Sequence, residues 1–341
     1  MKKTSLNDIA KKLGVSKTLV SLVLNGKGKE NRISDVVCEK VIQIAKEMNY
    51  QPNQLAKGLR TGKTNTIGLI IADIANPFFG KLGREIEREA ARKGYRVIFC
   101  SSDESAEKSK QQIEMLLQGQ VDGFIISPPM HSEEQILNLA RDKKPYVLID
   151  RYFPEIDSNY IIIDNQEAAY DATMHLVDKA YKKIAFITIN ADLVNMKDRL
   201  IGYKKALLDS GLPIDKNLIK VLPFSHEIKD VHNAIKQLIG KDKKGIDAIL
   251  FATSKVGVMG IESLSLLGLK IPDDVAVVSF DDPDAYKICS SPVTAIAQPL
   301  TDIGKMAVQV LLSEIKNPGS SIKTQKITLK TNFVIRKSCG S

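Results

Sequence analysis

Polar and charged side chains stand at the ends of apolar runs in the larger, C-terminal part of the chain. Three are acids, Asp73, Asp150 and Asp281, and Asp150 is followed directly by Arg151. Carboxylates and planar guanidinium groups can form paired hydrogen bonds with neighbouring hydroxyl groups, and an aromatic face such as that of Phe78 can cover the apolar side of a sugar ring. These residue types therefore predict a binding site for a polyol.

The full candidate set collects the polar residues that follow each run, one aromatic residue and one arginine expected near the start of a helix. It comprises Asp73, Asn76, Phe78, Ser101, Ser127, Asp150, Arg151, Asn190, Arg199, Ser254, Lys255 and Asp281. Ligands of parallel α/β sheets bind beyond the carboxyl ends of the strands, so these side chains are expected in one cleft. Asn76-Pro77 also fits a simple turn, Phe79 fits the core better than a stacking position, and Asp282 fits a helix cap better than a ligand contact.

The elements that must position these residues are strands that alternate with helical stretches. Eight apolar runs of strand length follow Thr66, at 67–72, 96–100, 123–127, 146–150, 183–188, 219–222, 248–252 and 275–280. Nearly continuous apolar strands separated by helices indicate parallel sheets that helices cover. Because eight units are too many for one compact sheet of the usual size, we expect two Rossmann-like lobes with the ligand cleft between them.

Several classes of function are disfavoured by what the chain lacks. The four histidines (His131, His175, His226 and His232) have no partnering pattern, and no nucleophile motif appears, so we expect neither an enzyme nor a bound cofactor. The four cysteines are far apart, which argues against a disulfide framework and against a metal site. No apolar run approaches the roughly 18 residues of a membrane span, and the N-terminus has no secretory apolar region, so we expect a cytoplasmic protein.

Positive charge is concentrated at the N-terminus. Up to Lys63 the chain carries thirteen Lys and Arg against five acids, a net charge of +8, while the whole chain of 341 residues has +9. A small, strongly basic module in front of a nearly neutral body is typical of nucleic-acid binding. A merely soluble basic end is the alternative.

Three short helices are expected in this basic module. Leu6, Ile9, Ala10 and Leu13 form the apolar stripe of the first, and Gly14 ends it. Ser16 can cap a second helix whose inward face is Val20, Val23 and Leu24 and which Asn25-Gly26 would end, and a third follows Ser34. Two helices joined by a glycine turn, closed by a third, predict a helix-turn-helix domain.

The outward face of the second helix would meet DNA. It presents Lys17, Thr18, Ser21 and Leu22, of which those near the helix start can reach base edges, while Ser16 and Ser21 suit phosphates. An ordinary solvated face is the alternative, but it would not favour Leu22.

The stretch after the third helix is expected to form a marginal helix. Pro52 could open it, while Gly58 in its middle costs about 1 kcal/mol relative to alanine, so we expect folding only on contact with a partner. Gly62-Lys63-Thr64 resembles the end of a phosphate-binding loop, but Lys57 stands where the Walker pattern needs glycine and no strand precedes it, so an NTPase is rejected.

The ordered motifs resemble those of the LacI/GalR-type bacterial transcription regulators over nearly the whole chain. They are Leu6-Asn7-Asp8-Ile9-Ala10, Gly14-Val15-Ser16, Val20-Ser21, Val23-Leu24-Asn25, Asn49-Tyr50, Pro52-Asn53, Ile67-Gly68-Leu69-Ile70, Asn76-Pro77-Phe78-Phe79, Asp150-Arg151, Arg199-x-x-Gly202-Tyr203 and Phe280-Asp281-Asp282. Each motif is weak alone, but the ordered set is specific. The resemblance implies a cytoplasmic homodimer that binds palindromic double-stranded operator DNA and associates with the nucleoid when bound, repression as the default, and a small-molecule effector that changes DNA affinity.

The resemblance also implies a domain plan: a helix-turn-helix domain at 1–50, a hinge helix and linker at 51–64, and a two-lobed, periplasmic-binding-protein-like core at 65–341. Lobe 1 would span about 65–164 plus 297–341, and lobe 2 about 165–296. The helix after Pro299 and that at 79–91 are candidates for a dimer interface, although each could equally pack on its sheet.

Carried over residue by residue, the resemblance places Lys17 and Thr18 at the bases and Leu59 as a wedge in the minor groove. The complete DNA-contacting set is Thr4, Leu6, Ser16, Lys17, Thr18, Ser21, Leu22, Asn25, Lys29, Tyr50, Asn53, Ala56, Lys57, Leu59 and Arg60. Leu22 departs from the usual arginine, Cys38 from a frequent basic residue, and the connector at 26–32 is longer than usual and more cationic. These departures predict an operator unlike the best-known ones.

The most informative departure in the core is Ser254-Lys255, where the family commonly has Asn-Asp. Exchanging an acid for a cation would favour an anionic effector, such as a sugar phosphate or a sugar acid, over a neutral sugar. Alternatively, Lys255 pairs with Asp281 or another acid and supports the cleft. A solute-binding protein with the same two-lobed body is the competing function, disfavoured by the basic front module and the missing signal peptide.

Overall fold

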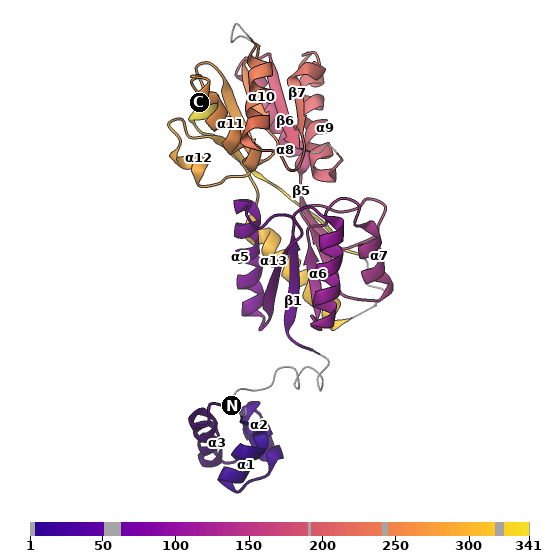
Figure 1. Ribbon diagram of the computed structural model, residues 1–341, viewed down its shortest axis with the longest axis vertical. Coiled ribbons are helices and arrows are strands. Elements are labelled where there is room, and N and C mark those ends of the chain that lie inside the picture. The colour runs from indigo at the N-terminus through magenta and orange to yellow at the C-terminus, as the bar shows by residue number, and fades with distance from the viewer. Residues whose placement is uncertain (1–3, 51–62, 190–191, 241–244, 318–323, 341) are drawn as a thin grey trace. The chain divides into compact units, whose positions relative to one another are not determined.

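The computed structural model describes residues 4–50, 63–189, 192–240, 245–317 and 324–340. The chain forms two compact units, residues 1–64 and residues 65–341. Figure 1 traces both. Among the described residues, no helix is long and apolar enough to cross a membrane.

Within its described residues, the N-terminal unit is built from three α-helices. They are α1 (Leu6–Leu13), α2 (Lys17–Leu24) and α3 (Asp35–Glu47). Gly14 ends α1 in the left-handed conformation, at φ 67°, which glycine adopts without steric cost. The Ser16 side chain accepts a hydrogen bond from the backbone N–H of Leu19 and so caps α2.

A small apolar core joins the three helices. Ile9 of α1, Val20 of α2 and Val41 of α3 are completely buried. The long connector contains a short 3-10 helix, η1 (Lys29–Asn31), and Cys38 is partly buried against it. A side chain at Gly28 would meet the Cys38 sulfur at 2.6 Å, so Cys38 packs beneath the connector.

The first lobe of the larger unit is an α/β layer structure around a six-stranded sheet. Its strands run in the order β11-β5-β4-β3-β1-β2, and every pairing is parallel. They are β1 (Thr66–Ile71), β2 (Arg96–Ser101), β3 (Gly123–Ile126), β4 (Tyr146–Ile149), β5 (Tyr160–Ile163) and β11 (Lys326–Leu329). Its helices are α5 (Pro77–Arg92), α6 (Ala106–Gln118), α7 (Glu133–Arg141) and α13 (Leu300–Lys316) (Figure 1).

The second lobe repeats this plan with a second six-stranded sheet, in the order β12-β10-β9-β8-β6-β7. Its strands are β6 (Ile184–Ile189), β7 (Ile219–Leu222), β8 (Ala248–Phe251), β9 (Ala276–Phe280), β10 (Thr294–Ala297) and β12 (Asn332–Val334), of which only β12 pairs antiparallel in this sheet. Helices α8 (Asn165–Asp178), α9 (Val194–Asp209), α10 (Ile228–Ile239), α11 (Ser254–Leu266) and α12 (Ala285–Ile288) belong to this lobe, with the 3-10 helices η2 (Lys216–Leu218) and η3 (Lys337–Cys339).

All eight predicted strands are present, which confirms the two parallel-rich α/β lobes. Strands β5, β10, β11 and β12 were not predicted as strands. The chain passes between the lobes after β5, after β10 and again between β11 and β12. Three segments therefore join the lobes.

The assignment of all of residues 297–341 to lobe 1 is wrong for the end of the chain. Strand β12 pairs with β10 of lobe 2. The hydroxyl of Ser338 accepts a hydrogen bond from the backbone N–H of Thr294 at 2.8 Å and donates to the Val277 carbonyl at 2.6 Å. Because these backbone groups are buried and need partners, the C-terminal segment is fastened to the second lobe.

Candidate functional site

A cleft that is partly open to solvent and lined by both polar and apolar side chains lies between the two lobes. The first lobe lines it with Asp73, Asn76, Phe78, Phe79, Asp150 and Arg151, and the second with Ile189, Leu193, Asn195, Met196, Arg199, Phe224, His226, Thr253, Lys255 and Asp281. Gln298, in the segment that leads from β10 to α13, completes the lining. The cleft lies at the carboxyl ends of the parallel strands of both sheets, as expected.

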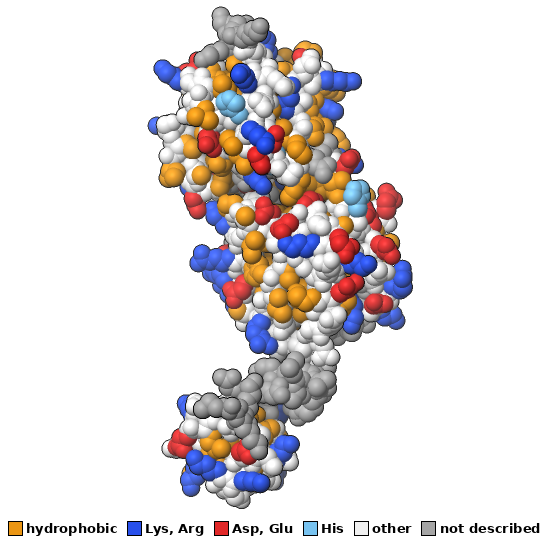
Figure 2. Space-filling view, in the orientation of Figure 1, with side chains coloured by type: hydrophobic (Ala, Val, Ile, Leu, Met, Phe, Trp, Pro, Cys, Tyr) orange, Lys and Arg blue, Asp and Glu red, His pale blue; other side chains and the backbone are white. Residues whose placement is uncertain are grey.

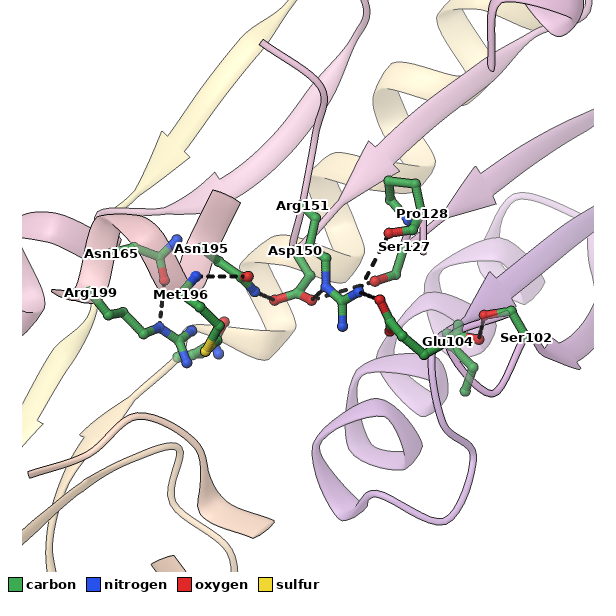
Figure 3. Close-up of polar contacts among 12 residues, drawn as sticks. Ser102, Glu104, Ser127, Pro128, Asp150, Arg151, Asn165, Asn195, Met196 and Arg199 are labelled. Atoms are coloured by element: carbon green, nitrogen blue, oxygen red, sulfur yellow. Dashed lines mark hydrogen bonds and ion pairs between the residues drawn. The ribbon is translucent and has the colours of Figure 1, made fainter. Parts of the chain in front are cut away.

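Asp150 and Arg151 follow β4 and are held by buried partners on both sides (Figure 3). Asp150 adopts the left-handed conformation, at φ 66°, and accepts a hydrogen bond from Asn195 of the other lobe at 3.2 Å. Arg151 pairs with Glu104 and lies 3.3 Å from the Asp150 carboxylate. Burial raises the pKa of Asp150, while the Arg151 guanidinium opposes this shift. Two carboxylates therefore neutralise Arg151.

Arg199 projects from α9 and is only 2% exposed. Its Nε donates to Asn165 at 2.8 Å, its Nη1 donates to the Ala252 carbonyl at 2.5 Å, and its guanidinium stacks 3.9 Å from the centre of the Phe280 ring. Burial lowers its pKa. An arginine nevertheless keeps its charge in proteins, so Arg199 presents a fixed, planar donor group at the cleft.

Asp281 follows β9 in the left-handed conformation, at φ 62°. Its carboxylate accepts hydrogen bonds from the Ser254 hydroxyl at 3.0 Å and from the Gln298 amide at 2.7 Å. Its Oδ2 also accepts from the Ser254 N–H at 3.4 Å, whereas among the described residues Oδ1 accepts only from Gln298, so Oδ1 can still accept a hydrogen bond from a ligand hydroxyl.

Lys255 stands in the first turn of α11, and its ammonium group lies 3.8 Å from the Asp73 carboxylate of the opposite lobe. The same nitrogen is 5.9 Å from the centre of the Phe224 ring. The pairing with an acid corresponds to the alternative in which Lys255 supports the cleft, although the partner is Asp73 and not Asp281.

Most of the predicted effector set meets in the cleft. Eight residues line it: Asp73, Asn76, Phe78, Asp150, Arg151, Arg199, Lys255 and Asp281. Asn76 also caps α5, since its side chain accepts from the Phe78 N–H at 3.0 Å. Asn190 lies outside the described residues.

Three predicted serines do not line this cleft. Ser127 donates to Asp150 at 3.4 Å and Ser254 donates to Asp281, so both orient acids that do line it. Ser101 donates to Asp103 at 2.6 Å and accepts from the Ile74 N–H, which fixes the loop after β2. Asp282 is not a helix cap: it forms two hydrogen bonds with Arg336, at 2.7 and 2.8 Å.

Sequence reasoning missed Asn195, Phe224, His226 and Gln298. Asn195 lies at the start of α9, and Phe224 and His226 follow β7, where the rule applied to the other strands would have found them. Gln298 directly follows β10, which was not predicted as a strand.

In the N-terminal unit, the predicted DNA-contacting residues that the structure describes are either exposed or half-buried. Lys17, Thr18 and Lys29 are exposed, whereas Leu6, Ser21, Leu22 and Tyr50 are half-buried. Two exposed or half-exposed polar groups already have partners: the Thr4 hydroxyl donates to the Met48 carbonyl at 2.8 Å, and the Asn25 amide donates to the Ser21 carbonyl at 2.6 Å. Asn53, Ala56, Lys57, Leu59 and Arg60 lie outside the described residues. Figure 2 shows the Lys and Arg side chains spread over the visible face of this unit.

Comparison with known proteins covers both units. Residues 5–53 match the model of bacterial regulatory proteins of the lacI family, and residues 64–337 match that of periplasmic binding proteins and the sugar-binding domain of the LacI family. The chain is 32% identical to the transcriptional regulator DegA of Bacillus subtilis, in a match that covers 98% of both chains. It is 30% identical to the ribose operon repressor of Haemophilus influenzae, in a match that covers 99% of both chains. The solved structure of the transcriptional regulator CelR with cellobiose matches 98% of this chain and 100% of its own, with a TM-score of 0.72 and 26% identity.

Proposed function

Because the chain belongs to the LacI family of bacterial regulatory proteins, we propose that the cleft between its lobes binds a small-molecule effector that controls its affinity for operator DNA. The chain is a DNA-binding regulator of transcription and not an enzyme. We propose repression as its mode of action, in line with the ribose operon repressor among its relatives.

The observation that carries the proposal is that both lobes contribute polar groups to one cleft. Asp150 of the first lobe bonds to Asn195 of the second, and Lys255 faces Asp73 across the cleft. A ligand that contacts both walls binds best when the lobes are close together, so it shifts the population towards that arrangement. Coupling between two sites of this kind typically amounts to about 1–3 kcal/mol.

We propose that the effector is a sugar or a sugar derivative. Three acids (Asp73, Asp150 and Asp281) and three cations (Arg151, Arg199 and Lys255) line the cleft, and Arg151 is also paired with Glu104. This balance leaves no surplus positive charge for a phosphate or a carboxylate and supports a neutral sugar better than the anionic one expected from Lys255 alone. The cellobiose complex of CelR supports the carbohydrate class.

The DNA-binding form is proposed to be a homodimer on a palindromic operator, because one headpiece contacts too few phosphates for tight binding. Lys17 and Thr18 are exposed on α2 and are proposed to read bases. Since bacterial operators lie in the cytoplasm, the protein is proposed to act there, at the nucleoid.

Thermal unfolding of the full chain against neutral sugars, sugar phosphates and uronic acids tests the effector class. A ligand at a hundred times its dissociation constant stabilises the folded state by about 2.7 kcal/mol, which raises the melting temperature measurably. Stabilisation by neutral sugars is expected. If only anionic sugars raise the melting temperature, Lys255 is an anion-binding group as first expected. If no sugar of the panel raises it, the carbohydrate class is refuted.

Operator control is tested separately. Fragments selected from genomic DNA by the purified protein are titrated by fluorescence anisotropy with and without the stabilising sugar. A change in operator affinity of about 5- to 150-fold is expected from the coupling energy above. Unchanged affinity with bound sugar would refute effector control.

A further inference from the structure

His226 is a buried cleft residue that none of the contacts described so far explains. It lies between β7 and α10, lines the cleft and is 3% exposed. Its Nδ1 is 2.9 Å from the Pro223 carbonyl oxygen. Its Nε2 is fully buried, and no group in the described part of the chain forms a hydrogen bond with it.

The Pro223 contact fixes which ring nitrogen carries the proton. A carbonyl oxygen only accepts hydrogen bonds, so Nδ1 must be the donor. In the neutral ring, Nε2 then carries a lone pair and is a hydrogen-bond acceptor. A buried acceptor without a partner costs free energy, so a donor that reaches Nε2 gains more than a typical hydrogen bond at the surface.

The surroundings keep the ring neutral. Burial and the Lys255 ammonium lower the pKa of His226, while the backbone carbonyls of Pro223 and Phe224 and the carboxylate of Asp230 raise it, with a net lowering. Phe224, two residues before His226, also lines the cleft. This part of the wall therefore combines an aromatic side chain, a cation paired with Asp73, and an uncharged acceptor.

We propose that His226 is a specificity residue for the effector: its Nε2 accepts a hydrogen bond from a hydroxyl group of the bound sugar. The inference rests on the proposed function, because it names one contact of the proposed effector. A hydroxyl group can donate to Nε2, whereas a carboxylate or a fully ionised phosphate offers only acceptors there. His226 therefore selects for a hydroxyl group at one position and against an anionic group at the same position.

Two substitutions of His226 separate its two nitrogens. In His226→Asn the amide can still donate to the Pro223 carbonyl, but nothing replaces Nε2. In His226→Gln the longer side chain can place its carbonyl oxygen near the position of Nε2. His131→Asn is the matched control, because His131 is exposed and does not line the cleft.

The experiment uses the full chain and the neutral sugar that most strongly raises its melting temperature among ribose, glucose, galactose and cellobiose. Calorimetric titration measures the dissociation constant of that sugar and of its single-deoxy analogues for the wild type and the three variants. His226→Asn is expected to bind the parent sugar about tenfold more weakly, His226→Gln to lose less, and the control to match the wild type. The wild type should bind one deoxy analogue about tenfold more weakly than the parent sugar. His226→Asn should bind that same analogue as tightly as the wild type does.

Each result decides a different statement. Equal binding of the parent sugar by His226→Asn and the wild type overturns the role of His226 and leaves the proposed function intact. A loss in His226→Asn that is the same for every deoxy analogue also overturns it, since the loss is then not tied to one hydroxyl. If none of the four sugars stabilises or binds the wild type, the neutral-sugar effector fails, and the inference fails with it.

Discussion

Lys255 and Asp73 form an ion pair across the cleft, and removing each charge separately tests what the pair does. The nitrogen–oxygen distance is 3.8 Å, and the two side chains are 36% and 19% exposed. At this separation the Coulomb energy is about 1 kcal/mol in water and about 4 kcal/mol at an effective dielectric constant of 20. Measured values for pairs exposed to solvent reach about 1 kcal/mol, so we expect the lower end of this range.

The assay is a double-mutant cycle with Lys255→Met, Asp73→Asn and the double variant. Because the pair joins the two lobes, each single variant is expected to bind the neutral sugar more weakly than the wild type. The double variant is expected to bind it at least as tightly as the single variant with the lower affinity. The interaction energy should be about 1 kcal/mol, which corresponds to about fivefold in the dissociation constant.

A direct ligand role for Lys255 would give a different pattern. Lys255→Met would then abolish binding of sugar phosphates or uronic acids, Asp73→Asn would strengthen it, and the two effects would add. An interaction energy near zero, with the effect confined to anionic sugars, would refute the supporting role. Binding is measured at two salt concentrations, since a partly exposed pair weakens as salt rises.

The remaining predictions concern Arg199, His226 and a close helix contact. Arg199→Lys should lower the free energy of unfolding by about 2–4 kcal/mol in urea denaturation and weaken sugar binding at least tenfold. The reason is that it leaves the buried Asn165 oxygen without the Nε donor and removes the stacking on Phe280. A change in the free energy of unfolding below about 0.5 kcal/mol would contradict this prediction. The pKa of His226 is lowered in the folded state, so the unfolded state binds more protons. The free energy of unfolding should therefore fall as the pH drops below the unfolded pKa of about 6.5, and it should fall less steeply in His226→Asn. Equal slopes of this free energy against pH for the two proteins would contradict the prediction. Gly202→Ala should make the protein insoluble or strongly reduce its melting temperature, because the new methyl group would stand 2.0 Å from the Gln166 carbonyl oxygen of α8. A stable variant with an unchanged circular dichroism spectrum would refute that packing.

Several of the strands that the sequence predicts have strong local signals. Strands such as β1 and β6 are buried along their whole length, so their apolar runs stand out. Strand β11 alternates between exposed and half-buried residues at the edge of its sheet, and β12 has only three residues. Such short edge strands exist because of tertiary pairing, and pairing between segments far apart in the sequence leaves little local pattern.

The candidate site was predictable to the extent that it follows strand ends. Asp73, Asp150 and Asp281 were found in this way, and all three line the cleft. The partners that orient these acids could not be read from the sequence, because they come from the other lobe or from distant elements, as Asn195 does for Asp150 and Gln298 for Asp281. Glu104 was missed as the partner of Arg151, and it changes the chemistry, since it neutralises an arginine that the sequence alone presents as a free cation.

The contacts across the cleft imply how an effector acts on the lobes. Asn195 bonds to Asp150, Lys255 pairs with Asp73, and Lys81 of α5 pairs with Asp284 at 3.1 Å. Apart from Asn195, which is buried, and the Asp150 side chain, which is 7% exposed, these groups remain partly solvated, so each of their contacts contributes little. The protein alone then holds the lobes together weakly. In the proposed function, a sugar that contacts Asp150 and Asp281 at once would shift the balance with a few hydrogen bonds. Under the same proposal, this weakness would let a single side chain such as His226 decide which sugar achieves the shift.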